Sequence, residues 1–517
     1  MTAATGAPVR HRTPRATSAV PLNAARLLRV ELRRNTMPWI LPLIAALFWF
    51  DSYRPSTGAS PLYGLRTFWN IGQGHTIIDF GPFVAGVAAW MGSRDGRRGL
   101  ADLVTTTARP RWAAQLATWA ATAIWAVAAY LVFVGVMFAV YAHQGVGGTP
   151  PWWWVAVGAT AVTAFSAVGF AIGAYWPSRF AAPVAAFGGF LAMFLSSQTG
   201  FSHTSGWALI LPTNSHGSFD GSAQTDSGIY YPWLPDLPIT RIMFLAGIAL
   251  AALGLTGLPA RAAGRWLRRV AAVLTLAGLA SAGTAVGLAR TAQESAHGVI
   301  IAALHDAAND APTTYTPACG RAAGVPVCLN PAYRRWLPDM TAALAPVLAE
   351  VTGLPGAPLR ATQVAASYPS GGDGPPQAMT FGGHPPVLRM QLGILNMPGP
   401  CGSCDGPVAA KQFADQMRFL FVRAFVGAGI VSPGSPVQQA VQAALLQGAG
   451  IPFAALPGLM IATQNFQGEG PGKWQPTASV YAAARRLAAL PAAARHAWLA
   501  AHLDALRAGQ LTLKDLP

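Results

Sequence analysis

Long apolar runs alternate with short polar segments up to Arg290, and the pattern then changes. A helix needs about 20 mostly apolar residues to cross a bilayer. Runs of about this length predict seven spans, at about 37–53, 76–92, 113–142, 152–175, 181–198, 241–259 and 269–289. The first and fifth runs are short, and the fifth could be half of a broken helix. The pattern is typical of a polytopic α-helical membrane protein.

The segment between the second and third runs is short and basic. Its arginines are Arg94, Arg97, Arg98, Arg109 and Arg111. Loops of this kind remain on the cytoplasmic side of a membrane. Leu100, Leu103 and Val104 recur at helical spacing, and Pro110 closes the pattern because it disfavours a helix before it. We therefore predict about two turns of helix, at about 97–108, that lie on the inner bilayer surface or dock onto a soluble partner.

Charge in the other loops predicts one orientation for the whole chain. The N-terminal segment, 176–180 and 260–268 contain arginine, whereas 143–151 has no charged residue and 199–240 has three aspartates and no lysine or arginine. Counting spans places every basic loop inside. We expect a plasma-membrane protein with a cytoplasmic N-terminus and with the residues after Arg290 outside the cytoplasm.

The N-terminal part divides into two segments before the first span. Residues 1–21 are polar and basic, which is typical of a disordered cytoplasmic tail, and we expect no cleaved signal peptide. Residues 22–36 predict an interfacial amphipathic helix, with an apolar stripe of Ala24, Leu27, Leu28 and Leu32. A helix that runs straight into the first span is the alternative.

The loop at 199–240 has apolar patches broken by glycine and proline, at 207–212 and 229–237. Such patches beside a membrane are typical of re-entrant or interfacial helices, which protein or water must shield. We predict an external re-entrant segment here, and an ordinary exposed loop is the alternative.

Residues 291–517 predict a separate extracytoplasmic α+β domain, long enough to bury its own core. Helical patterns occur at 339–352, 411–426, 436–447, 479–490 and 493–507, and strand patterns at 359–366 and 386–395. The four cysteines fall here: Cys319, Cys328, Cys401 and Cys404. Their even number in an external domain favours two local disulfides, and a metal site or redox activity are the alternatives.

Composition supports a membrane protein and argues against a soluble or nucleic-acid-binding protein. The chain is 52% hydrophobic and 10% charged, whereas soluble proteins carry about 25% charged residues. The net charge of +16 comes from arginines at the ends of apolar runs, so we expect no nucleic-acid partner.

Candidate catalytic motifs are incomplete. The nearest match to a nucleotide-binding loop has Gln467 in place of its first glycine and Trp474 where Ser or Thr would hold magnesium. The sequence has no H-E-x-x-H and no G-x-S-x-G. We therefore predict a chain that is not an enzyme and that has no catalytic residue, bound metal or cofactor of its own.

An acid inside the membrane is a functional candidate. Asp79 lies three residues into the second span, followed by Gly81 and Pro82. Together with Gly188 and Gly189 of the fifth span, these residues form the predicted translocation path. A hydrated carboxylate near the outer interface is the alternative for Asp79.

The layout of residues 22–260 resembles the permeases of type-2 ATP-binding-cassette (ABC) exporters. In that family a cytoplasmic loop reading roughly basic-x-x-G-T-L-x-x-L-L-x-x-P-x-S-R carries the coupling helix that contacts the ATPase. The segment RRGLADLVTTTARPR at 97–111 is similar to it, although its proline is displaced and the usual acid before the glycine is absent. The resemblance implies ATPase contacts at Arg97, Arg98, Gly99, Leu100, Leu103, Val104 and Arg109.

The external domain weakly resembles the gluzincin metallopeptidase-like modules fused to some such permeases, through 328–333 (CLNPAY) and 351–355 (VTGLP). Because the zinc-binding motif is missing, the resemblance implies a catalytically dead module.

Together these resemblances imply a permease subunit of an exporter, driven by a separate cytoplasmic ABC ATPase that binds ATP and magnesium. It would form a homodimer or pair with a sister subunit in the lipid bilayer. The alternative is a membrane-anchored extracytoplasmic binding or sensor protein without transport activity.

Overall fold

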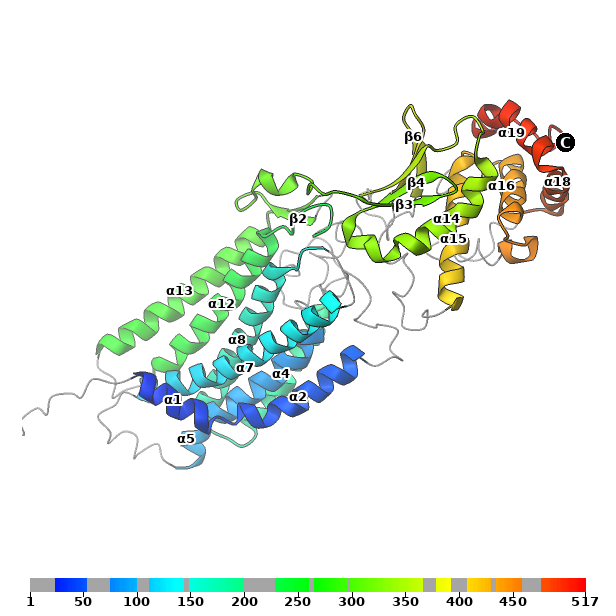
Figure 1. Cartoon of the computed structure of the whole chain (residues 1–517). Helices are drawn as coiled ribbons and strands as arrows, with labels where there is room; N and C mark the ends of the chain where they lie inside the picture. Colours follow the sequence, from blue (N-terminus) through cyan, green and yellow to red (C-terminus); the bar gives the residue numbers. More distant parts are fainter. Residues whose placement is uncertain are drawn as a thin grey trace, which may run out of the picture.

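The computed structural model describes residues 24–53, 75–99, 111–143, 148–198, 228–259, 265–295, 298–365, 378–391, 407–428, 434–457 and 476–517. The chain forms a bundle of long apolar helices followed by a domain built on a β-sheet (Figure 1). The sheet domain lies beyond the end of the bundle that is opposite to α1 (Figure 1).

Every apolar run predicted from the sequence lies within a helix. The helices of the bundle are α1 (Ala24–Arg34), α2 (Met37–Tyr53), α4 (His75–Gly92), α5 (Arg94–Arg97), α7 (Arg111–His143), α8 (Trp152–Tyr175), α9 (Ala181–Gln198), α12 (Asp236–Gly257) and α13 (Arg265–Ala289). Within the described residues, four of these, α7, α8, α12 and α13, are long and apolar enough to cross a membrane. The helices α2, α4 and α9 contain shorter apolar stretches. These lengths are compatible with a membrane location.

Small residues bring the helices of the bundle into close contact. A Cβ added at Gly169 or Gly173 of α8 would overlap the backbone of Ala85 or Ala89 in α4. Between α12 and α13, a Cβ at Gly247 would come within 2.6 Å of the Gly278 carbonyl oxygen. Helices in membranes commonly pack through such small residues, because their backbones can then approach closely.

The predicted amphipathic helix is confirmed as a helix separate from α2. Leu27, Leu28 and Leu32 are half-buried against the bundle, whereas Arg29 and Arg33 are exposed. The chain turns between α1 and α2 (Figure 1). A helix running straight into the first apolar stretch, the alternative from sequence, is therefore not formed.

The C-terminal domain has five strands in the order β3-β4-β5-β7-β6. The strands are β3 (Ala318–Ala322), β4 (Val325–Leu329), β5 (Arg360–Val364), β6 (Ala378–Gly382) and β7 (Val387–Gln391). The β4-β5 and β5-β7 pairs are parallel, and β3-β4 and β6-β7 are antiparallel. The helices are α14 (Leu337–Val351), α15 (Pro407–Phe425), α16 (Pro436–Gly448), α18 (Ala478–Ala489) and α19 (Ala492–Arg507).

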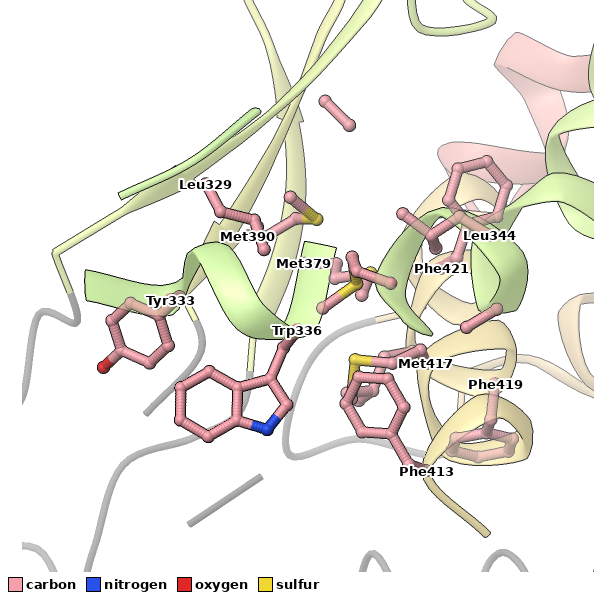
Figure 2. Packing of buried hydrophobic residues seen from close by; sticks show 14 of the residues in the cluster. Leu329, Tyr333, Trp336, Leu344, Met379, Met390, Phe413, Met417, Phe419 and Phe421 are labelled. Carbon is pink, nitrogen blue, oxygen red and sulfur yellow. The ribbon is translucent and has the colours of Figure 1, made fainter. Parts of the chain in front are cut away.

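Alternation along the strands gives the sheet one buried face. Leu388 and Met390 of β7 are fully buried, whereas Arg389 between them is exposed. Helices α14 and α15 cover the buried face, where Met379 and Met390 meet aromatic side chains from the helices (Figure 2). The same cluster of buried residues continues into the bundle.

The hairpin of β3 and β4 contains one of the two predicted disulfides. Cys319 and Cys328 face each other across the antiparallel pair and are bonded, with their Cα atoms 4.1 Å apart. The second predicted pair, Cys401 and Cys404, lies outside the described residues.

A second, two-stranded hairpin joins the bundle to the sheet domain. Strands β1 (Ala292–Ser295) and β2 (Gly298–Ile301) follow α13, and β2 packs against α12. Part of the predicted re-entrant segment lies beside them: residues 228–231 form a tight turn in which Tyr230 is buried. The Tyr230 carbonyl accepts a hydrogen bond from the Thr313 amide at 2.7 Å. Residues 232–235 lead from this turn into α12, so that 236–240 are the start of a long helix and not part of a re-entrant segment. Residues 199–227 lie outside the described residues.

Candidate functional site at the arginine-rich end of the bundle

The directions of the helices bring the basic segments of the bundle to one end. Helices α2, α7, α9 and α13 begin at the end where α1 lies, and α4, α8 and α12 finish there (Figure 1). We call this the α1 end. Its described arginines are Arg26, Arg29, Arg33, Arg34, Arg94, Arg97, Arg98, Arg111, Arg179, Arg265, Arg268 and Arg269. Segments that are far apart in the sequence therefore share one basic surface.

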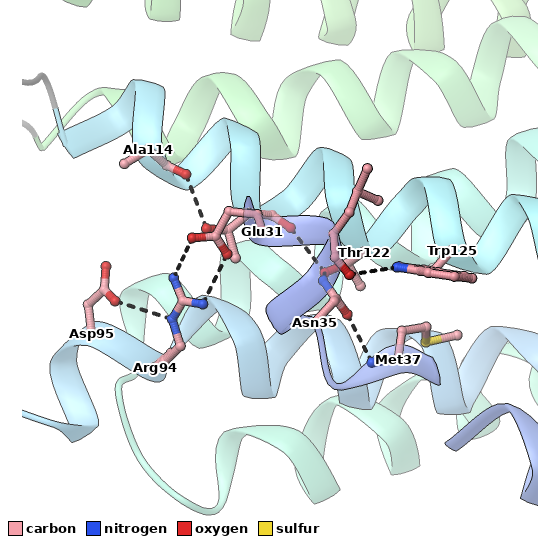
Figure 3. Close-up of polar contacts among 10 residues, drawn as sticks. Glu31, Asn35, Met37, Arg94, Asp95, Ala114, Thr122 and Trp125 are labelled. Carbon is pink, nitrogen blue, oxygen red and sulfur yellow. Dashed lines mark hydrogen bonds and ion pairs between the residues drawn. The ribbon is translucent and has the colours of Figure 1, made fainter. Parts of the chain in front are cut away.

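An ion pair joins α1 to the start of the basic loop. Arg94 donates from both terminal nitrogens to Glu31, at 3.0 and 3.1 Å (Figure 3). Asp95 lies 3.5 Å from the Arg94 Nε. Burial lowers the pKa of Arg94, but the hydrogen bond and the charge of Glu31 outweigh it, so that the pKa is raised. The two hydrogen bonds to Glu31 therefore fix the position of the Arg94 side chain, and the Glu31 carboxylate stabilises its positive charge.

Arg97 is also held in place. Its Nε donates to the Ser93 hydroxyl at 2.9 Å, and one terminal nitrogen donates to the Trp90 carbonyl at 2.9 Å. Its guanidinium lies 3.4 Å from the centre of the Trp90 ring, which is a cation–π contact. Partial burial, followed by the charge of Arg98, lowers the pKa of Arg97. Arg98 itself is exposed, so it is the arginine of this pair that a partner can reach.

Further contacts fix α1 against α7. The Trp125 indole donates to the Leu32 carbonyl at 3.0 Å, and the Asn35 amide donates to the Thr122 hydroxyl at 2.9 Å (Figure 3). The Asn35 side-chain oxygen accepts from the Met37 amide and so caps the start of α2. The two bonds to α7 join residues about ninety positions apart, and no local pattern in the sequence indicates them.

Both described edges of the basic loop are packed closely. A Cβ at Gly96 in α5 would overlap the Pro177 ring, which lies between α8 and α9. After the loop, the buried Trp112 donates from its indole to the Leu253 carbonyl of α12 at 3.2 Å. The loop therefore leaves the bundle beside α8 and returns against α12.

The structure places only part of the predicted coupling helix. Helix α5 ends at Arg97, and Gly99 has a φ of +65°, a left-handed conformation that does not continue an α-helix. A helix over the rest of 97–108 would have to begin after Gly99. Leu100, Leu103, Val104 and Arg109 lie outside the described residues.

The predicted translocation path is a packed contact between α4 and α9. Gly189 lies against Pro82, where an added Cβ would be 3.4 Å from the Pro82 Cα, and Gly81 lies against the Phe165 ring. Gly188 faces open space instead. Asp79 is in the first part of α4, and its side chain is outside the described part of the structure.

The opposite end of the bundle carries a cluster that the sequence analysis missed. Asp236, at the start of α12, is fully buried, and its Oδ2 accepts from the Ile301 amide at 2.9 Å. His305 Nδ1 is 3.1 Å from the same oxygen, and its Nε2 is 3.1 Å from Asp310. Both ring nitrogens face carboxylates, an arrangement that suits the protonated imidazolium.

The pKa of His305 is shifted by these partners. The hydrogen bond to Asp310 raises it, burial lowers it, and the charge of Asp236 raises it, so that the net shift is upward. A histidine pattern in the sequence did not indicate this cluster, because its members lie 69 and 5 residues apart and only the fold brings Asp236 to the other two.

Neither a search for metal-binding side chains nor a comparison with known proteins adds a further candidate site. No group of three or more His, Cys, Asp or Glu residues is arranged to hold a metal ion in the part of the chain that the structure describes. No known protein family, curated protein or solved structure matched the chain. The functional assignment therefore depends on the geometry of the two ends of the bundle.

Proposed function

We propose that this chain is the membrane-spanning permease subunit of an ABC-type exporter, driven by a separate cytoplasmic ATPase that docks at the α1 end. In this proposal the arginine-rich end faces the cytoplasm and the sheet domain lies outside. A second copy of the chain or a sister subunit completes the transporter. The observation that carries the proposal is the clamp that joins α1, α5 and α7 at the base of the basic loop, with Glu31–Arg94 at its centre.

The clamp supports the proposal because a docked ATPase must move several helices together. A force applied to the loop would reach α4 through Arg97 and Ser93, α1 through Arg94, and α12 through Trp112. Packed helices that are linked by polar contacts move as rigid bodies rather than one at a time. The loop is thus built to pass motion from a partner into the bundle.

The surplus of positive charge supports the sidedness of this proposal. At the α1 end the described residues include twelve arginines and only two carboxylates, Glu31 and Asp95, and Arg94 engages both. The exposed guanidiniums on α1, such as Arg29 and Arg33, would favour the inner face of a membrane, which carries anionic lipids.

The docking proposal is tested with Leu103→Asp, which places a charge on the apolar stripe of the predicted coupling segment. The full chain is extracted in mild detergent, and an ATP-binding subunit is sought by mass spectrometry and by vanadate-sensitive ATPase activity. We expect both to be present with the unsubstituted chain and lost with Leu103→Asp, while the variant still inserts into the membrane.

The matched control is Leu359→Asp, which makes the same change at a 63% exposed position in the sheet domain. This variant should retain the ATPase. If the ATPase remains bound to Leu103→Asp as firmly as to the control, the docking assignment is wrong.

A membrane-anchored extracytoplasmic binding or sensor protein is the second candidate. The observation that favours it is the fixed junction, in which Asp236 of α12 binds both Ile301 and His305. Such a junction could report on a ligand of the sheet domain. Extraction of the unsubstituted chain without any ATP-binding subunit would favour this candidate over the exporter.

A further inference from the structure

A recess opens at the α1 end, between the start of α7 and the last turns of α8 and α12. Its volume is about 180 Å³, and its lining is Arg111, Gln115, Ala174, Tyr175, Thr256 and Pro259. None of these residues belongs to the clamp between α1 and α5. The recess is therefore a feature of the bundle that the docking proposal does not use.

The polar groups on one wall are suited to an anion. Arg111 and Gln115 are four residues apart on α7 and therefore lie on the same face of that helix. Both side chains are half-buried, and within the described residues neither has a hydrogen-bond or ion-pair partner. A guanidinium and an amide together offer N–H donors but only one acceptor oxygen, which matches a phosphoryl group.

The opposite wall repels an anion less than two helix ends with free carbonyl oxygens would. Helices α8 and α12 both end here, and carbonyl oxygens in a last turn carry partial negative charge. However, the Leu255 carbonyl accepts from the Tyr175 hydroxyl, and the Leu253 carbonyl accepts from the Trp112 indole and the Thr256 hydroxyl. These hydrogen bonds occupy two carbonyls in the last turns of α12 and so reduce the negative charge at that helix end.

Aromatic and basic side chains at the α1 end, with Tyr175 of the recess among them, indicate the depth at which the recess would lie in a membrane. Tyr175 is 54% exposed, Trp176 45% and Trp266 71%. Exposed Tyr and Trp side chains gather at the level of lipid headgroups, as do arginines such as Arg265 and Arg268 at the start of α13. The recess is thus at the height where a lipid phosphate would sit.

We propose that this recess binds the phosphoryl headgroup of an anionic phospholipid, with Arg111 and Gln115 as its ligands. Basic pockets between membrane helices on the cytoplasmic side bind such headgroups in general. The proposal depends on the membrane location and on the sidedness given above, but it needs neither a partner ATPase nor transport. Its failure can therefore be distinguished from failure of the exporter proposal.

The test measures lipid binding to the full chain in mild detergent by native mass spectrometry, with dioleoyl phosphatidylglycerol as the probe and dioleoyl phosphatidylcholine for comparison. We expect one phosphatidylglycerol to bind more tightly than the rest and more tightly than phosphatidylcholine. Arg111→Gln should weaken this binding by about five- to tenfold, the effect of one arginine on an anionic headgroup.

Arg179→Gln is the matched control, because it removes one charge at the same end of the bundle but outside the recess. It should change the affinity less than twofold, whereas an equal loss in both variants would show diffuse attraction and overturn the proposal. Ala174→Leu fills the recess with every charge kept, so it should also weaken binding even if Arg111→Gln folds poorly. Unchanged binding in Ala174→Leu would count against the site.

Inorganic phosphate is the remaining arm of the experiment, because it shares the chemistry of the headgroup. In large excess it should compete only weakly with phosphatidylglycerol, since it lacks the acyl chains that the bilayer face of the bundle holds. If phosphate alone binds as tightly as the lipid and depends equally on Arg111, the site takes a free anion and the lipid assignment is wrong.

Discussion

At the α1 end of the bundle, Glu31 engages Arg94 while most of the surrounding arginines stay exposed; at the opposite end, Asp236 is fully buried and its only described cationic partner is a histidine. The first end uses this ion pair to hold α1 to α5 and a hydrogen bond from Trp125 to hold α1 to α7, and it presents the remaining charge outward. The second uses its carboxylate to fasten the sheet domain to α12. One end thus leaves most of its charge exposed, as the proposed docking requires, and the other fixes the chain that leads into the sheet domain.

The difference shows how burial changes the role of a charge. Breaking a partly exposed ion pair such as Glu31–Arg94 costs less stability than breaking a fully buried one, so its value is mainly geometric. A fully buried carboxylate must be compensated, because a buried charge without partners is costly. We therefore expect substitutions at the Asp236 end to act on stability and substitutions at the α1 end to act mainly on position.

The largest effect should come from Asp236→Ala. It removes the acceptor of the Ile301 amide and the partner of His305 together, which should destabilise the junction by about 3 kcal/mol. Opening of the junction would expose the chain after Arg290, so trypsin cleavage there should become on the order of a hundredfold faster. Asp236→Asn keeps an acceptor for Ile301, so cleavage at an intermediate rate is expected; equal rates in both variants would show that the charge alone matters.

A smaller effect is expected from Glu31→Gln. The glutamine amide is uncharged and has only one acceptor oxygen for the two hydrogen bonds of Arg94. Because the pair is mostly shielded from water, we expect the free energy of unfolding to fall by about 1–2 kcal/mol. A double-mutant cycle with Arg94→Gln, measured by thermal unfolding in detergent, isolates this pair. Arg33→Gln, an exposed position on the same helix, should leave the unfolding temperature unchanged. A coupling energy near zero would show that Glu31 and Arg94 do not stabilise each other, and the clamp would be rejected.

The two ends should also differ in their response to pH. The pKa of His305 is raised by Asp310 and Asp236, so its ion pairs contribute fully below the ordinary histidine value of about 6.5. That contribution is lost as the pH rises through the raised pKa. Denaturation of the junction should therefore become easier as the pH rises above about 6.5 and through the raised pKa, whereas His305→Gln should flatten the dependence. A dependence that is just as steep in His305→Gln would assign it to another group.

The smallest effect is expected from Trp90→Leu, which removes the ring beneath Arg97. A cation–π contact at a partly exposed site contributes about 0.5–1 kcal/mol, and the hydrogen bonds of Arg97 to Ser93 and to the Trp90 carbonyl remain possible. Thermal unfolding should fall slightly, and the change should vanish in an Arg97→Gln background. Trp39→Leu, at an 85% exposed ring, is the control and should show no such coupling.

The sequence predicted the helices better than the contacts between them. Long apolar runs and the α1 stripe have a clear period, so α1, α7, α8 and the helices of the sheet domain were found close to their observed bounds. Strands β3, β4 and β6 were missed, because each contains glycine or proline, which are depleted in strands. The disulfide between β3 and β4 followed from the even number of cysteines and their expected place in an external domain.

The candidate sites divide in the same way. The arginine-rich loops predicted the α1 end, because charged residues are absent from long apolar runs and gather in the loops between them. By contrast, Glu31–Arg94 and Asp236–His305 join residues 63 and 69 positions apart, and their partners depend on the packing of whole helices. A single sequence has no local signal for such pairs, so the clamp and the junction became visible only in the fold.

The sidedness of the bundle is the central claim, and cysteine labelling tests it most directly. Arg98→Cys places a thiol on the exposed part of the basic loop, and Leu359→Cys places one on the exposed surface of the sheet domain. Each is treated in intact cells with a membrane-impermeant maleimide and compared with the unsubstituted chain. We predict labelling of Leu359→Cys at once and of Arg98→Cys only after permeabilisation; labelling of Arg98→Cys in intact cells would contradict the account.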